Sequence, residues 1–229
     1  MPRPHLISAG VCASLMLTCP AAMAFVSHDV QMAAPAAKAV GCPIDPKLPF
    51  GAAIEPWPGA KDKQVQIVAT SSDVNDPVDL GVLCVGVVRS VGSGFAKVAG
   101  LAGRGPRPAA ETGPVMNVYL AIDPTPFHYA PGQTAFAVRV TGEFNSDSTN
   151  VHYDRLYMYR IDGTRLEQIF SAKVGDGTID KVAGAEDTTT RVIKFSPQMT
   201  RGVFDLLLSD KSHRKFRRYV WTGAQYAPG

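Results

Sequence analysis

Hydrophobic positions in the second half of the chain form short runs that turn residues separate. FAVRV, LYMYRI, LEQIF, RVIKF, FDLLLS and FRRYVW follow one another between residues 136 and 221. Each run has the length of a strand, and the gaps leave little room for helices. Three dipeptides in these gaps predict turns: Asp162-Gly163, Asp176-Gly177 and Thr222-Gly223. The pattern predicts antiparallel β-structure.

The first half of the chain is less regular. Apolar residues predict strands over 64–70 and 82–89, and a third strand over 116–122. Residues 25–62 are rich in Ala, Pro and Gly and show no sustained period, which is typical of a linker or an extended segment. Glycines and prolines fill residues 96–114, which favours a connection between two lobes.

These patterns together predict a mainly β protein with antiparallel sheets and few or no helices after the N-terminal segment. A sandwich, a barrel and a small propeller-like arrangement all remain open. The expected organisation is a signal peptide over 1–24, a linker or extended segment over 25–62, a first β lobe over 63–95, a Gly- and Pro-rich connection over 96–114, and an antiparallel β lobe over 115–229.

The N-terminal residues have the features of a secretory signal. Arg3 precedes an apolar run from Leu6 to Leu17, and Ala22-Met23-Ala24 fits the small-x-small pattern of signal peptidase sites. Polar and small residues interrupt the run, which is shorter than a membrane span, and no later segment is long and apolar enough to be one. We expect cleavage after Ala24 and export to the periplasm or beyond.

Cysteine content predicts one disulfide. The chain has four cysteines, of which Cys12 and Cys19 leave with the signal. Cys42 and Cys84 remain, and two thiols in an oxidising compartment pair. No Cys-x-x-Cys motif suggests redox or zinc chemistry, so the pair is expected to be structural.

The net charge of the mature chain does not indicate a class of partner. Of the 23 Lys and Arg and 20 Asp and Glu residues, only Arg3 lies in residues 1–24, so the mature chain has a net charge of +2. Such a balance predicts no preference for nucleic acid. Basic and aromatic residues mix in residues 211–219, and this hairpin could rest on lipid phosphates as part of a structural envelope component. The acidic loop over 73–79 lacks the EF-hand glycine and glutamate, and no metal or cofactor is expected.

No catalytic motif is present, which favours a non-enzymatic protein. His152 and Asp154 are two residues apart and share a face if the chain is extended. Ser146 and Ser148 are near in sequence, but neither stands in a strand-turn-helix elbow. A secreted cell-wall or glycan hydrolase that uses His152 and Asp154 as acid and base is therefore the alternative hypothesis.

Residues 73–95 resemble part of the periplasmic inhibitors of invertebrate-type lysozymes. That family has an acidic turn, a buried strand and an Arg-Ser-x-Gly-Ser-Gly loop whose serine and following tyrosine enter the lysozyme cleft. Here the strand is VLCVGVV, the loop is residues 89–94, and Phe95 stands where the family has tyrosine. The resemblance implies a binding or inhibitor-like protein. Its partner would be a macromolecule, for example another protein. The implied partner-binding residues are Ser90, Ser93, Gly94 and Phe95.

Overall fold

The computed structural model describes residues 30–44, 51–72, 82–101, 117–210 and 216–229. One helix, α1 (Val30–Val40), precedes twelve strands. The strands are β1 (Ala52–Pro56), β2 (Val65–Ser72), β3 (Val82–Val91), β4 (Gly94–Leu101), β5 (Asn117–Ala130), β6 (Gln133–Asn145), β7 (Thr149–Asp162), β8 (Arg165–Asp180), β9 (Ala185–Thr200), β10 (Val203–Asp210), β11 (Phe216–Trp221) and β12 (Tyr226–Pro228). The prediction of a mainly β, antiparallel fold with few helices is confirmed.

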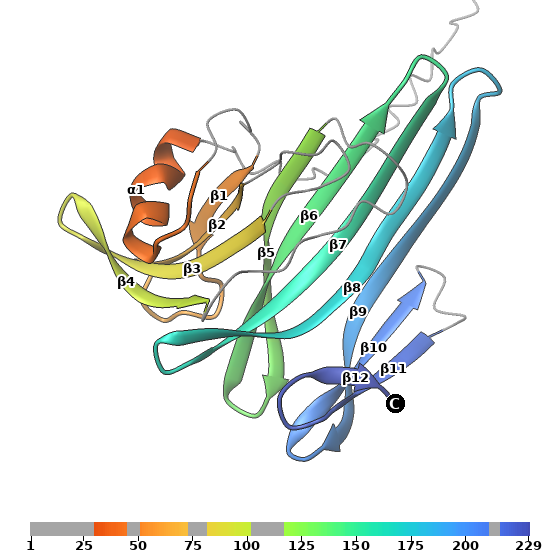
Figure 1. Cartoon of the computed structure of the whole chain (residues 1–229). Helices are drawn as coiled ribbons and strands as arrows, with labels where there is room; N and C mark the ends of the chain where they lie inside the picture. The colour runs from red at the N-terminus through yellow and green to blue at the C-terminus, as the bar shows by residue number, and fades with distance from the viewer. Residues whose placement is uncertain (1–29, 45–50, 73–81, 102–116, 211–215) are drawn as a thin grey trace, which may run out of the picture.

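Strands β1 to β4 form an antiparallel meander in chain order, and α1 lies on its outer side (Figure 1). Small side chains let the helix approach closely: Ala33, Ala36 and Ala37 are fully buried against Val68 and Val88. Strand β4 then pairs in parallel with β8, where Gly100 and Leu101 face Arg165 and Leu166.

Strands β5 to β8 form a second antiparallel meander of longer strands. Both faces of its central part are buried. Val138 and Tyr157 pack toward β1–β4, whereas Ala137, Leu156 and Met158 point the other way. Alternate residues of one strand thus belong to two different cores, as the two-residue period of a strand requires.

Strand β9 belongs to two sheets. Residues 185–190 pair with β8, and residues 191–200 pair with β10. Strands β10, β11 and β12 continue in antiparallel order and cover the outer face of β5–β8. Figure 1 shows the result as layers: α1, then β1–β4, then β5–β8, then β10–β12. The sheet is mostly antiparallel and is not closed into a barrel, and buried hydrophobic side chains fill the space between successive layers.

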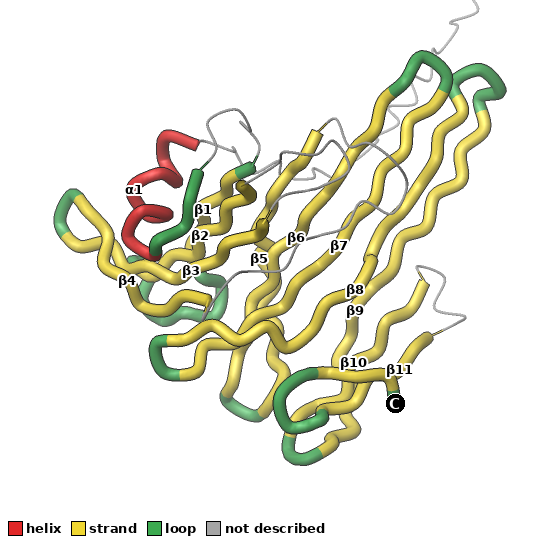
Figure 2. Tube along the Cα trace, viewed as in Figure 1, coloured by secondary structure: helices red, strands yellow, loops and turns green. Residues whose placement is uncertain are grey.

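Tight turns join most of the long strands (Figure 2). The predicted turn at residues 162–163 is present, with Asp162 as the last residue of β7 and Gly163 at φ +59° as the first turn residue. Arg201 and Gly202 both have positive φ, which is the pattern of a type I′ turn between β9 and β10. The predicted turn at Thr222-Gly223 joins β11 to β12.

The predicted turn at Asp176-Gly177 is wrong, because both residues lie inside β8. A Cβ on Gly177 would lie 2.4 Å from Cε1 of His152 on the neighbouring strand. The glycine is therefore compatible with a strand position that a neighbouring imidazole covers, and it does not mark a chain reversal.

Three segments differ from the expected organisation. One is β1, which lies within the predicted linker or extended segment and pairs with β2. Residues 30–40, within the predicted linker, form α1, because its alanines supply a narrow apolar stripe that packs on the sheet even though Pro35 stands inside the helix. Residues 96–101, within the predicted connection, continue β4, because their backbone pairs with β3. The predicted signal peptide and most of residues 96–114 lie outside the described residues.

Candidate functional site

The β3–β4 hairpin carries the residues that the sequence singled out. Val91 and Gly94 are paired, and the turn between them consists of Gly92 and Ser93. Gly92 has φ +56°, so a positive φ occurs at the first turn position only, as in a type II′ turn. Val91 is 58% exposed and Ser93 is exposed. The tip therefore presents one apolar side chain and one hydroxyl to solvent.

The base of this hairpin is fixed on several sides. Cys84 of β3 forms the predicted disulfide with Cys42, which follows α1, with a Cα–Cα distance of 5.6 Å. Val40 at the end of α1 packs on Gly86, where a Cβ would come within 2.6 Å of its methyl groups. Arg89 forms an ion pair with Asp62 at 3.2 Å. The hairpin therefore projects past α1 from a constrained base (Figure 1).

The four implied partner-binding residues do not have equal exposure. Ser93 and Gly94 are exposed at the tip, and Ser90 is half-buried and paired with Phe95. The Phe95 ring is half-buried against the cluster that α1 forms with β1–β3. Its position suits an anchor for the hairpin, whereas Val91 is the exposed apolar group next to Ser93.

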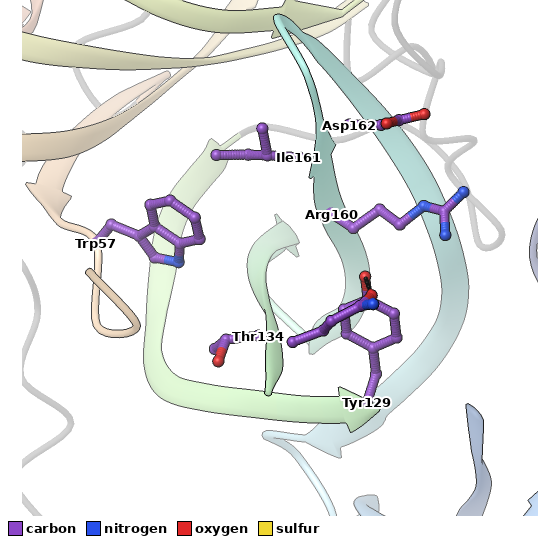
Figure 3. Close-up of a pocket in the computed structure, with 7 residues that line it drawn as sticks. Trp57, Tyr129, Thr134, Arg160, Ile161 and Asp162 are labelled. Carbon is purple, nitrogen blue, oxygen red and sulfur yellow. Dashed lines mark hydrogen bonds between the residues drawn. The ribbon is translucent and has the colours of Figure 1, made fainter. Parts of the chain in front are cut away.

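A cleft opens between the segment after β1 and the β5–β6 and β7–β8 turns (Figure 3). Its volume is about 410 Å³, and its lining comes from three distant parts of the chain. The lining residues are Trp57, Tyr129, Gln133, Thr134, Arg160, Ile161 and Asp162. Trp57 packs edge-on against Phe136, with ring centroids 6.2 Å apart.

One wall of the cleft is held by polar contacts. Tyr129 donates a hydrogen bond to Oε1 of Gln133 at 2.5 Å, and Arg160 lies near its phenol. Burial raises the pKa of Tyr129, so the phenol stays protonated and remains a donor.

Arg160 is fixed from two sides. Its Nε and Nη2 donate to Oε2 of Glu167 at 2.9 and 2.6 Å, and its guanidinium stands 5.1 Å from the ring centroid of Trp221. Burial lowers the pKa of Arg160, but the hydrogen bonds and charge of Glu167 outweigh that effect and raise it. The Glu167 carboxylate thus compensates the positive charge of the Arg160 guanidinium.

His152 and Asp154 lie on one face of β7, as the spacing predicted, but their surroundings are those of a sheet surface. His152 covers Gly177 and Asp154 covers Gly175 on β8. The Asp154 carboxylate accepts a hydrogen bond from the Thr141 hydroxyl. Ser146 is bound to the backbone of Thr149 in the β6–β7 turn. Among the described residues, neither Ser146 nor Ser148 forms a hydrogen bond with His152.

The basic hairpin is described only in part, because residues 211–215 lie outside the described residues. The acidic loop over 73–79 also lies outside them. Arg217 and Arg218 are neighbours on β11, and Arg218 binds the buried Asp205 at 2.6 Å. Within the described ranges, no group of three or more His, Cys, Asp or Glu side chains is placed to hold a metal ion.

Comparisons with protein-family models, with curated proteins and with solved structures find no match for this chain. Among the described residues no helix has the length and apolar character needed to cross a membrane. The geometry of the hairpin and of the cleft is therefore the basis for assigning a function.

The cleft was not predicted from the sequence. Its residues come from a predicted linker, from a loop between two strands and from a strand end, and their proximity follows from the layering of the sheets. The only hint in the sequence was that Trp57, one of two tryptophans, stands in a Pro-rich segment where a large aromatic ring has no local packing partner.

Proposed function

We propose that this chain is an exported, non-enzymatic binding protein that captures another protein by inserting the β3–β4 hairpin tip into a cleft of that partner, in the manner of an inhibitor. The observation that carries the proposal is the tip itself: an exposed valine and serine on a two-residue turn whose base is fixed by a disulfide. A tip held in this way loses little conformational entropy on binding.

Local chemistry supports a protein partner. The tip offers Val91 for an apolar contact and Ser93 for a hydrogen bond, and Gly92 and Gly94 leave the backbone accessible on both sides. Arg89 is paired with Asp62, so the charge of this arginine is compensated at the base of the hairpin. Binding at such a site depends on shape and on a few buried contacts, which is the usual distribution of energy in a protein interface.

Substitution of the tip is expected to abolish capture. In Val91→Ala with Ser93→Ala, both exposed contacts are lost, and the affinity for the partner falls by about thirtyfold or more. The mature chain, immobilised with its disulfide intact, is tested for binding and inhibition of an invertebrate-type lysozyme, and then for stoichiometric capture from periplasmic and host extracts.

The matched control is Val182→Ala, because Val182 is 82% exposed at the β8–β9 turn. This variant is expected to capture the partner as the wild type does. Both proteins should keep the wild-type thermal midpoint, since exposed substitutions change stability by about 0.5 kcal/mol or less. Equal capture by the tip variant and the wild type contradicts the proposed role of the hairpin.

Export is the second part of the proposal, and the Cys42–Cys84 disulfide supports it because such bonds persist in oxidising compartments. Expression in a bacterial host is expected to yield a periplasmic chain that begins at Phe25. Intact-mass measurement of the periplasmic and cytoplasmic fractions checks this expectation. A chain that is retained in the cytoplasm with residues 1–24 attached contradicts it.

A further inference from the structure

We infer that the cleft between Trp57 and Tyr129, which is separate from the hairpin tip, binds a neutral sugar. The cleft has a volume of about 410 Å³, within the range of small-molecule sites. Figure 3 shows that Trp57 and Tyr129 stand on opposite sides of the opening, with Ile161 and Thr134 completing its margin. Apolar walls and polar groups therefore face one another across a space of ligand size.

The first argument is an unsatisfied donor. The Trp57 indole N–H is buried and has no hydrogen-bond partner among the described residues. A buried donor of this kind destabilises the folded state when nothing accepts its proton. Figure 3 shows the indole nitrogen on the side of the ring that faces the cleft. A ligand oxygen at this point would accept the proton, whereas a purely apolar ligand would leave it unsatisfied.

The second argument concerns the remaining polar groups. The Gln133 carbonyl oxygen accepts a hydrogen bond from Tyr129, and its amide nitrogen donates no hydrogen bond to another described residue. Asp162 is exposed at the margin and offers a carboxylate acceptor. The cleft thus presents donors and an acceptor together. A molecule with several hydroxyl groups satisfies both kinds, because each hydroxyl donates and accepts.

The third argument concerns charge. Arg160 is the cationic side chain of the lining, and Glu167 compensates it at 2.6 Å. The Asp162 carboxylate repels an anion, so neither a phosphate nor a sugar acid fits this balance. The aromatic walls favour a ring with an apolar C–H face. Among common small molecules, a neutral sugar combines such a face with many hydroxyl groups.

The test uses the mature protein and a panel of neutral sugars: glucose, N-acetylglucosamine, cellobiose and diacetylchitobiose, with glucuronate as the anionic comparison. Tryptophan emission is a direct readout, because Trp57 lines the cleft and Trp221 stacks on Arg160 behind it. At least one neutral sugar is expected to shift the emission saturably at concentrations up to about 50 mM, a weak-affinity range. Glucuronate is expected to bind more weakly than glucose.

Two variants locate the binding. Trp57→Phe keeps an aromatic ring but removes the N–H, and calorimetry is expected to show an affinity loss of about tenfold. Asp162→Ala alters an exposed group, so it leaves folding intact and is expected to weaken binding severalfold. Asp187→Ala on β9 is the matched control and leaves the affinity unchanged. Absence of saturable binding by every neutral sugar, equal affinity in all variants, or tighter binding of glucuronate overturns the inference.

Discussion

Reduction of the Cys42–Cys84 disulfide is expected to lower the thermal midpoint of unfolding by about 10 °C. The bond joins residues 42 positions apart and ties the segment after α1 to β3. In the chain-entropy model, a loop of this length stabilises the folded state by about 4 kcal/mol, because the unfolded chain loses freedom. The measurement is thermal unfolding followed by circular dichroism with and without a phosphine reductant.

The double variant Cys42→Ala with Cys84→Ala separates this effect from a general action of the reductant. Its midpoint is expected to match that of the reduced wild-type protein and to be insensitive to reductant. Because α1 packs on the sheet beside the bond, the loss should include weaker docking of the helix. A reduced wild type that unfolds at the oxidised midpoint contradicts the assigned role of the disulfide.

Arg218→Ala is expected to destabilise the protein by about 3 kcal/mol, because it leaves a buried carboxylate without its cation. Asp205 is 0% exposed and accepts hydrogen bonds from Nε and Nη2 of Arg218 at 3.0 and 2.6 Å. Thr200 supplies the other donor at 2.7 Å. The Arg218 side chain is 44% exposed, so water can partly replace it beside Asp205. The expected loss of stability is therefore at the lower end of the range of about 3–5 kcal/mol for breaking a buried ion pair.

The matched control is Arg217→Ala, which removes the same charge from the neighbouring exposed position of β11. It is expected to change the free energy of unfolding by about 0.5 kcal/mol or less in urea titrations. The double variant Asp205→Asn with Arg218→Ala should recover part of the loss, since no buried charge remains. Equal stability of Arg217→Ala and Arg218→Ala argues against a stabilising pair.

Much of the β-structure was predictable from local patterns. Alternation of apolar residues in FAVRV and the Gly163 turn depend on neighbouring residues only, so they could be predicted without tertiary information. The length of β8 could not, because small residues at 175 and 177 suggest a break when they are considered alone. They are strand residues because their backbone pairs with β7 on one side and β9 on the other, and their small size leaves room for His152 and Asp154.

Helix α1 and the cleft also could not be predicted from local sequence patterns. The alanine stripe of α1 buries little area by itself, so its helical form depends on the sheet against which it packs. The β3–β4 turn depends on residues that lie close together in sequence, but the exposed Val91 beside it was not among the residues that the sequence singled out. The cleft was not predictable, because Trp57, Tyr129 and Arg160 meet only when three separate segments reach the same end of the layers.

The sharing of β9 between two sheets limits how the chain can be dissected. A cut near residue 190 would separate the part of β9 that pairs with β8 from the part that pairs with β10. Each fragment would expose an unpaired strand edge and one face of the β5–β8 core, both of which promote aggregation. We therefore expect the β9–β12 sheet to unfold together with β5–β8, and truncated forms that end before β10 are poor candidates for study.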